Sequence, residues 1–507
     1  MWTPPESVSV SISLLLEMAT SNDPERTAVV SGDVRLTTQQ LSDLADGGAG
    51  IIARSGASHV AYVGLGGAML PLLIFAAARA GVPFTPINYR LSAEGIKTLI
   101  GRLPNPLVVV DNRYLDEVGD VGGVIVSDDF LAQARDAESA AEFADPDSVG
   151  IVLFTSGTTS QPKAVELTHN NLTSYVTGTV EFGSAEPTDA ALICVPPYHI
   201  AGVSAALSNL YAGRKMVYLP IFDADEWVRL IDVEHVTSAT VVPTMLDRIV
   251  AVLQRGQHRL PSLGTLAYGG SKVPLPLVRK ALELLPHVGF VNAYGLTETS
   301  STIAVLTPDD HREAQAAADP AVLKRLGSVG QPVPSVEVQI RDESGAVLPA
   351  GQTGELFVRG EQVSGRYTGI GSVLDAEGWF PTKDIATLDE GGYLFIGGRS
   401  DDTIIRGGEN IAPAELEDVL VEHPHVRDVA VVGVDDPQWG QAIVAVVVPA
   451  VGADPDPEDL REHVRKSLRG SRTPDRVVFR DELPTNATGK VLRREIVEEL
   501  RAAPAEQ

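Results

Sequence analysis

The sequence has little cysteine and little positive charge for its 507 residues, and both shortages exclude classes of protein. Cys194 is the sole cysteine, so an intramolecular disulfide is impossible, and no Cys/His cluster has the spacing of a zinc site. Lys and Arg number 40 against 67 Asp and Glu, which gives a formal net charge of −27. That balance argues against a general binder of nucleic acid or anionic membranes. If an anion binds, the positive charges that hold it must be local.

Targeting segments and long membrane-spanning runs are also missing. The N-terminal stretch MWTPPESVSV has neither the basic nor the apolar region of a signal peptide. Residues 60–78 are uncharged, but Gly64, Gly66, Gly67 and Pro71 interrupt them. This punctuation favours a buried strand–turn–helix unit over a transmembrane span. We therefore expect a globular, cytoplasmic protein without a transmembrane segment.

The chain is too long for one ordinary hydrophobic core, and its pattern of strand-like and helical segments changes twice. Apolar strand-like runs first alternate with helical segments, which predicts parallel sheets with helices on their faces. Short, turn-bounded strands follow from about Gly327, and beyond Arg399 comes a compact α+β unit with helices near 412–422, 457–469 and 489–502. The predicted fold class is α/β. It comprises a large N-terminal domain (1–397) with a β-rich subdomain (327–397), a hinge (398–402) and a small C-terminal α+β domain (403–507).

The segment FTSGTTSQPKAVELTH, residues 154–169, places hydroxyls, a glycine and Lys163 directly after the strand-like run VGIVLF. A strand followed by a small-residue loop rich in N–H and O–H donors, and then a lysine, suits a polyphosphate. The spacing is not that of a Walker A loop, because Pro162-Lys163 replaces the second Gly-Lys-Ser/Thr. Taken alone, the segment is equally compatible with a polar surface turn.

Six further motifs follow this loop along the chain. They are PPYHIAG (196–202), NAYGLTETS (292–300), GELFVRG (354–360), WFPTKD (379–384), GRSDDTIIRGGENIAPAELE (398–417) and PTNATGKVLRREI (484–496). In this order and spacing, the seven motifs resemble the adenylate-forming superfamily of acyl-CoA synthetases, luciferases and peptide-synthetase adenylation domains, and are closest in type to fatty-acid–CoA ligases. The resemblance covers nearly the whole chain. It implies Mg²⁺-dependent activation of a carboxylic acid by ATP to an acyl-AMP, then transfer to the thiol of CoA.

Residues in these motifs suit a magnesium-bound nucleotide. Glu298 is a hard oxygen ligand for Mg²⁺, with Thr159 as the second predicted ligand, and Thr297 can contact the α-phosphate. The loop residues predicted to bind the β- and γ-phosphates are Thr155, Ser156, Gly157, Thr158, Thr159 and Lys163.

For the nucleoside, Tyr294 offers a flat face to adenine, and Gly295 permits close approach of the backbone. Asp384 can accept both ribose hydroxyls, and Arg399 can donate to the same sugar. Without the motif context, Tyr294 would read as a core aromatic and the charged residues as ordinary surface groups. The other predicted nucleotide-binding residues are Gly270, Ser271, Asn292 and Ala293.

The resemblance also assigns residues to catalysis and domain movement. It implies that Lys490, on the mobile small domain, reaches the carboxylate and the α-phosphate, where a preorganised charge contributes about 3–4 kcal/mol. It places a hinge at Asp401, passage of the pantetheine arm at Gly407 and Gly408, and His199 beside the acyl pocket and thiol channel. The predicted catalytic set is Lys490, Glu298, Thr297 and His199.

The chain departs from the family pattern at three glycines, replaced by Ser160, Ala164 and Lys383. The stretches IAGVSAAL and PTMLDR are apolar and small, which favours an acid with an apolar tail, fatty or aryl, and a fatty acid in particular. Three functions remain open. They are a CoA ligase, favoured because no inserted segment is evident, an acyl-AMP ligase that loads the phosphopantetheine of an acyl carrier protein, and a non-catalytic nucleotide-binding protein.

Overall fold

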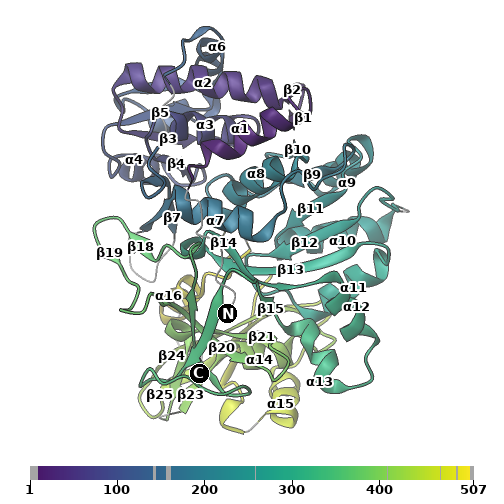
Figure 1. Ribbon diagram of the computed structural model, residues 1–507. Helices are drawn as coiled ribbons and strands as arrows, with labels where there is room; N and C mark the ends of the chain where they lie inside the picture. Colours follow the sequence, from purple (N-terminus) through teal and green to yellow (C-terminus); the bar gives the residue numbers. More distant parts are fainter. Residues whose placement is uncertain are drawn as a thin grey trace, which may run out of the picture.

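The computed structural model describes residues 10–140, 144–155, 162–256, 258–407, 409–468, 470–486 and 489–502 (Figure 1). Two large, mostly parallel sheets lie in the N-terminal part, an antiparallel sheet follows, and the C-terminal elements form a further sheet with their own helices. The predicted α/β class, with a large sheet-containing part followed by a smaller α+β part, is confirmed. We keep the boundary at 398–402 as a proposal.

The nine-stranded sheet has the order β15-β14-β13-β12-β11-β9-β10-β1-β2. Its central pairs are parallel, and the pairs β1–β2, β13–β14 and β14–β15 are antiparallel. Its strands are β1 (Thr27–Ser31), β2 (Val34–Thr37), β9 (Ala190–Ile193), β10 (Lys215–Tyr218), β11 (Ser238–Val241), β12 (Thr265–Gly269), β13 (Gly289–Leu296), β14 (Ser301–Leu306) and β15 (Gln331–Pro332).

The eight-stranded sheet has the order β19-β18-β8-β7-β4-β3-β5-β6. The strands from β7 through β4, β3 and β5 to β6 pair parallel, whereas the pairs β7–β8, β8–β18 and β18–β19 are antiparallel. Its strands are β3 (His59–Val63), β4 (Phe84–Ile87), β5 (Pro106–Val110), β6 (Val124–Val126), β7 (Val149–Thr155), β8 (Lys163–Thr168), β18 (Arg366–Tyr367) and β19 (Gly371–Ser372). The run VGIVLF is therefore the strand that its composition predicts.

Helices cover these sheets, and side chains from both sheets join one hydrophobic core. Every residue of α3 (Met69–Arg79) is buried, and α3 packs against α8 (Ile200–Ala212). The apolar stretch 60–78 is thus strand β3, a turn and helix α3. Among the described residues, no helix combines the length and apolarity needed to cross a membrane. The other helices here are α1 (Ser13–Asn22), α2 (Thr38–Ser55), α4 (Ala93–Ile100), α5 (Leu115–Val118), α6 (Ser127–Asp136), α7 (His169–Thr179), α9 (Ala224–Val233), α10 (Pro243–Arg255), α11 (Leu275–Leu284), α12 (Pro308–Ala316) and α13 (Pro320–Leu323).

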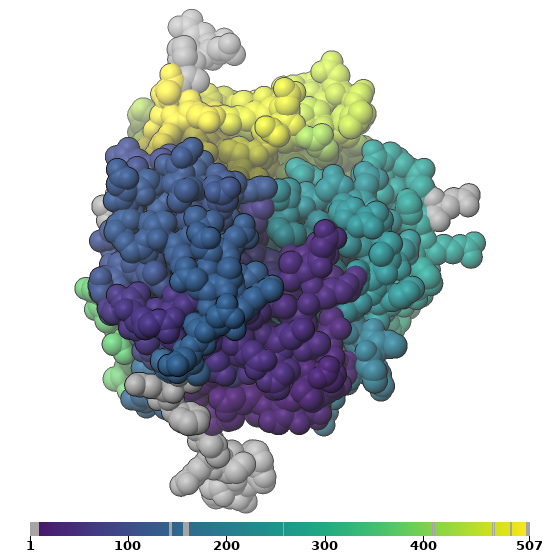
Figure 2. Space-filling view, turned by 90° about the horizontal axis from the view of Figure 1, so that it is seen from above, coloured from purple at the N-terminus to yellow at the C-terminus, as the bar shows by residue number. Residues whose placement is uncertain are grey.

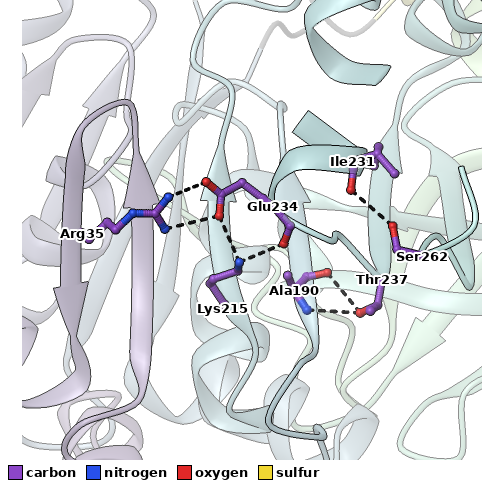
Figure 3. A network of polar contacts seen from close by, with 7 residues as sticks. All are labelled: Arg35, Ala190, Lys215, Ile231, Glu234, Thr237 and Ser262. Carbon is purple, nitrogen blue, oxygen red and sulfur yellow. Dashed lines mark hydrogen bonds and ion pairs between the residues drawn. The ribbon is translucent and has the colours of Figure 1, made fainter. Parts of the chain in front are cut away.

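A partly buried charge network joins strands at one edge of the nine-stranded sheet (Figure 3). Glu234, directly after α9, accepts from Arg35 of β2 at 2.6 Å and from Lys215 of β10 at 3.0 Å. The hydrogen bond from Arg35 is the main reason that the pKa of Glu234 is lowered. Because the carboxylate joins a β2 side chain to β10 and α9, the network has a structural role.

The short strands predicted beyond Gly327 form an antiparallel sheet in the order β16-β17-β20-β21. Its strands β20 and β21 lie beside the C-terminal elements in Figure 1. The strands are β16 (Glu337–Arg341), β17 (Thr353–Arg359), β20 (Phe380–Leu388) and β21 (Leu394–Arg399).

The C-terminal elements have two hydrophobic clusters of their own, one on each side of the β24–β25 hairpin. In Figure 2 this part, in yellow, forms a layer along one side of the molecule against segments in blue and teal. Its elements are β22 (Ile404–Arg406), β23 (Glu409–Ile411), α14 (Pro413–Leu420), β24 (Val426–Asp436), β25 (Gly440–Pro449), α15 (Pro457–Ser467), β26 (Arg476–Phe479) and α16 (Arg493–Ala502).

Candidate active site

The predicted ribose pair is formed across two neighbouring strands. Asp384 of β20 and Arg399 of β21 are direct register partners, and Arg399 Nη1 donates to Asp384 Oδ1 at 3.1 Å. Asp384 is only 4% exposed, so it is not an ordinary surface acid. Its other oxygen accepts from the hydroxyl of Tyr294, which burial and the Asp384 charge keep protonated by raising the Tyr294 pKa. Three residues from separate motifs therefore form one cluster.

The segment after Tyr294 has an irregular backbone. The β13–β14 register shifts between Tyr294 and Gly295, and a Cβ on Gly295 would come within 1.8 Å of the Ser301 carbonyl oxygen. Close approach of backbone to backbone explains this glycine within the protein itself. The chain then turns through a 3₁₀ segment, Thr297–Thr299, which carries Thr297 and Glu298.

Glu298 lies beside a residue that sequence reasoning missed. The hydroxyl of Tyr367 in β18 donates to Glu298 Oε1 at 2.8 Å, and Lys163 Nζ lies 5.4 Å from the centroid of the Tyr367 ring. Burial and the negative charge of Glu298 raise the Tyr367 pKa, so its hydroxyl stays a donor. Tyr367 thus connects Glu298 to Lys163 at the end of the predicted phosphate loop. Its position in a two-residue strand far along the chain gave no recognisable sequence signal.

Part of the predicted phosphate loop lies outside the described residues, namely Ser156, Gly157, Thr158 and Thr159, together with the departure Ser160. At the loop's edges, Thr155 and Lys163 face each other across the β7–β8 pair, and the Thr155 hydroxyl contacts the Lys163 carbonyl oxygen at 3.5 Å. Ala164 is buried in regular β8 pairing opposite Phe154, so glycine is not required there.

Of the described residues that replace a family glycine, Lys383 is the one with a strained backbone. Its φ is +63°, the left-handed conformation that favours glycine, and it immediately precedes Asp384. Such a residue stores about 1 kcal/mol or more of strain. Its side chain forms an ion pair with Glu355 at 3.4 Å, outside the Asp384 cluster.

Lys490 is brought to this region by a tight turn of the C-terminal part. Its N–H donates to Asn486 Oδ1 and its carbonyl accepts from the Asn486 N–H, both at 2.9 Å. Although the residue has exposed surface, protein atoms crowd the ammonium, and this loss of hydration, followed by the charge of Arg399, lowers the Lys490 pKa. Asp384 acts in the opposite direction. The structure therefore places Lys490 within electrostatic range of the predicted ribose pair.

Among the residues predicted beside the base, some make contacts within the protein and one has a buried hydroxyl without a described partner. Gly270 has φ +85°, and the Ser271 hydroxyl oxygen is buried without a hydrogen-bond partner among the described residues. The Asn292 side chain donates to the Ser328 carbonyl at 3.0 Å, which is a contact within the protein. The carbonyl of Ala293 lies so near Gly269 that a Cβ there would come within 2.2 Å.

His199 is the residue directly before helix α8, far from the Asp384 cluster in the sequence. Its Nε2 and the neighbouring Tyr198 hydroxyl are both buried, with no hydrogen-bond partner in the described parts of the chain. The two rings lie 4.7 Å apart, and Tyr198 meets Tyr89 edge-on at 5.4 Å. Burial, with a smaller effect of Arg90, lowers the His199 pKa to about 4, so the imidazole is neutral at physiological pH.

The predicted hinge residue lies at the proposed domain boundary, and Gly407 follows it in the C-terminal part. Asp401 is exposed in the 3₁₀ turn Ser400–Asp402. Gly407, with φ +59°, donates its N–H to the Trp439 carbonyl at 2.8 Å, and a Cβ would lie 3.2 Å from the Trp439 ring. Gly408 lies outside the described residues.

No three His, Cys, Asp or Glu side chains gather into a metal site in the described ranges. Glu298, with one oxygen held by Tyr367, suits Mg²⁺, which is commonly held by one or two carboxylates together with substrate phosphates.

The chain is similar to known proteins over most of its length. The model of the AMP-binding enzyme family matches residues 16–368, and that of the AMP-binding enzyme C-terminal domain matches residues 415–490. An indoleacetate–CoA ligase of Aromatoleum aromaticum is 31% identical over 94% of this chain and 95% of its own length. A feruloyl-CoA synthase of Amycolatopsis is 33% identical, with 93% and 96% covered. A fatty acid–acyl-carrier-protein ligase of Streptomyces coeruleorubidus, ScoC, is 31% identical, with 94% and 93% covered.

Two solved structures are similar over nearly their full length. ATP-bound MatB of Rhodopseudomonas palustris superposes with a TM-score of 0.86 at 26% identity, covering 97% of this chain and 99% of that one. An o-succinylbenzoate CoA synthetase of Bacillus subtilis, in complex with its acyl-adenylate intermediate, gives a TM-score of 0.82 at 26% identity, covering 95% and 97%.

Proposed function

The chain belongs to the AMP-binding enzyme family, and we propose that it activates an apolar, aromatic carboxylic acid as its acyl-AMP and transfers it to coenzyme A. It is an AMP-forming acid–thiol ligase that uses ATP, Mg²⁺ and CoA. The observation that carries the site assignment is the convergence of Tyr294, Asp384 and Arg399 with Lys490, which comes from the other end of the chain.

In the first half-reaction, the carboxylate of the acid displaces pyrophosphate in line from the α-phosphate of ATP. This step needs positioning and charge neutralisation more than covalent help from the protein. Asp384 and Arg399 would hold the ribose, and a bound ribose hydroxyl would compete with Tyr294 for one Asp384 oxygen. Lys163 would hold the outer phosphates. Mg²⁺, when bound at Glu298, supplies further positive charge to the phosphates.

Lys490 would neutralise the charge between the attacking carboxylate and the α-phosphate. Its ammonium is already partly desolvated, and its turn is fixed by the paired hydrogen bonds with Asn486. A preorganised charge of this kind has no reorganisation cost at the transition state.

In the second half-reaction, the thiol of CoA attacks the acyl carbonyl, the carbon–oxygen bond to AMP breaks, and AMP leaves. We propose that the small domain turns at Asp401 between the two steps, which removes Lys490 and brings the Gly407 turn to the site. The exposure of Asp401 and the positive φ of Gly407 support this assignment.

For the acid, two relatives named for indoleacetate and feruloyl substrates favour an aromatic ring over the fatty acid that sequence motifs suggested. The neutral His199 and Tyr198 lie among the rings of Tyr89 and Tyr114, which suits an aromatic ligand. A fatty acid, and a carrier protein as acceptor, form the second candidate because the relative ScoC is named for both.

A panel of aromatic and fatty acids in a hydroxamate-trapping assay tests the acid. We expect trapping with aryl-acetic or cinnamic-type acids and little with long fatty acids. Adding CoA or a loaded carrier protein to preformed acyl-AMP then tests the acceptor. Absence of ATP–pyrophosphate exchange with every acid would revive the non-catalytic alternative.

A further inference from the structure

One ion pair joins the two parts of the chain across the proposed domain boundary. Lys272 follows Ser271 in the loop after β12, and its Nζ lies 2.5 Å from Oδ1 of Asp418 in α14. Of the ion pairs between described residues, this one alone connects a residue before 398 with a residue after 402. Its side chains are 45% and 58% exposed.

A steric contact lies in the same interface. Gly489, with φ +74°, lies against Thr244 at the start of α10, since a Cβ there would come within 2.9 Å of the Thr244 methyl group. The next residue is Lys490. Because Lys490 directly follows this contact, the position of the small domain against α10 also positions Lys490.

Another pair across the interface is repulsive. Burial is the largest cause of the raised pKa of Asp428 in β24, and the negative charges of Glu417 and of Asp247 in α10 add to it. The charge of Asp247 therefore works against the contact between α10 and β24. The attraction between Lys272 and Asp418 acts in the opposite direction.

Helix α14 also connects Asp418 to the segment that carries Lys490. Glu417, adjacent to Asp418, accepts from Arg493 Nη2 at 2.5 Å and from the Val431 N–H at 2.7 Å. Arg493 is three residues beyond Lys490 and lies 4.0 Å from Asp402 at the hinge. Helix α14 therefore links Asp418, through Glu417 and Arg493, to Asp402 at the hinge and to the segment that carries Lys490.

We propose that Lys272 and Asp418 are positioning residues for the first half-reaction. Their ion pair holds the small domain in the arrangement in which Lys490 faces Asp384 and Arg399. Breaking it shifts the domain equilibrium away from acyl-AMP formation without touching the reacting groups. This inference rests on the proposed function, because it divides the reaction into two half-reactions with different domain arrangements.

The test compares Lys272→Ala, Asp418→Ala and the swap Lys272→Asp/Asp418→Lys. Because exposed pairs contribute little, each single variant should lose roughly two- to five-fold in ATP–pyrophosphate exchange. Thioester formation from preformed acyl-AMP and CoA should be unchanged or faster, and the swap should restore exchange. The matched control is Lys280→Ala, since the Lys280–Glu283 pair is 3.2 Å long, 44% and 60% exposed, and lies within α11. It should change neither rate.

Asp418→Ala is the decisive single variant, because Lys272 adjoins the predicted base-binding loop and its loss could act locally. Equal losses in both half-reactions, or failure of the swap to restore exchange, would overturn the proposal. A readout independent of activity is the rate of tryptic cleavage after Arg399 and Arg406. It should rise two- to five-fold in Asp418→Ala and return in the swap, and an unchanged rate would contradict the proposal. If the wild type shows no exchange with any acid, the proposed function fails, while the cleavage rates still decide the positioning role.

Discussion

Replacing Lys490 with Ala is the sharpest test of the site, because the turn that carries this lysine is held by backbone contacts. Asn486 bonds the N–H and carbonyl of Lys490, so removing the side chain should leave the turn and the fold intact. The expected effect is on the first half-reaction alone.

The magnitude follows from the surroundings of the ammonium. A preorganised charge at a developing transition state contributes about 3–4 kcal/mol. We take the lower end, about 3 kcal/mol, because Arg399 remains beside Asp384 and Lys490 has exposed surface. The exchange rate should therefore fall roughly 150-fold. The assay is ATP–pyrophosphate exchange, with thioester formation from preformed acyl-AMP as the control reaction.

The pH dependence gives a second readout. Lys490 acts in its charged form, and loss of hydration and Arg399 lower its pKa below the ordinary 10.5. The exchange rate should thus decline on the alkaline side as the lysine loses its proton. Lys490→Arg should lose this decline, because a guanidinium stays protonated. A loss below ten-fold in Lys490→Ala, or equal losses in the two half-reactions, would refute the assigned role.

Three further predictions concern the hinge, the metal ligand and the buried histidines. Asp401→Pro, which fixes φ, should spare exchange and slow thioester formation, and equal losses in stopped-flow assays of the two steps would count against the hinge. Tyr367→Phe removes the donor to Glu298, so the Mg²⁺ concentration for half-maximal exchange should rise about five-fold in a titration, with the fold unchanged by circular dichroism. Burial lowers the pKa values of His59 and His169 to about 4, below the unfolded value of 6.5. The unfolded state therefore binds more protons between pH 6.5 and 4, and urea unfolding should show stability falling by about 1.4 kcal/mol per pH unit for each histidine, a slope absent above pH 7.

Local patterns in the sequence predicted local structure well. The run VGIVLF is β7, as its composition predicts. The helix expected from residue 489 begins only at Arg493, because Lys490 pairs with Asn486 in a turn that precedes the helix. A short polar turn and a helix start share the same small residues, so composition could not separate them.

Contacts between segments that are distant in the sequence could not be predicted from such local patterns. The motifs supplied Asp384 and Arg399 as a pair, and the β20–β21 register makes them partners. No pattern indicated that the hydroxyl of Tyr294 would meet Asp384, or that Tyr367 would meet Glu298. These contacts depend on how three sheets come together, which one-dimensional spacing does not encode.

The distribution of charge explains why nucleotide binding and domain position should depend on each other. In a chain with a net charge of −27, Arg399 and Lys490 lie close enough that each opposes the charge of the other. A bound triphosphate removes this repulsion, so ATP should favour the arrangement in which Lys490 faces the nucleotide site. Binding linkage is reciprocal, and whatever stabilises that arrangement must therefore raise the affinity for ATP. The Lys272–Asp418 pair stabilises it from outside the nucleotide site, so Asp418→Ala should weaken ATP binding by the factor by which it lowers the population of that arrangement. Equilibrium titration with a non-hydrolysable ATP analogue measures that factor, and an unchanged affinity would show that the two are uncoupled.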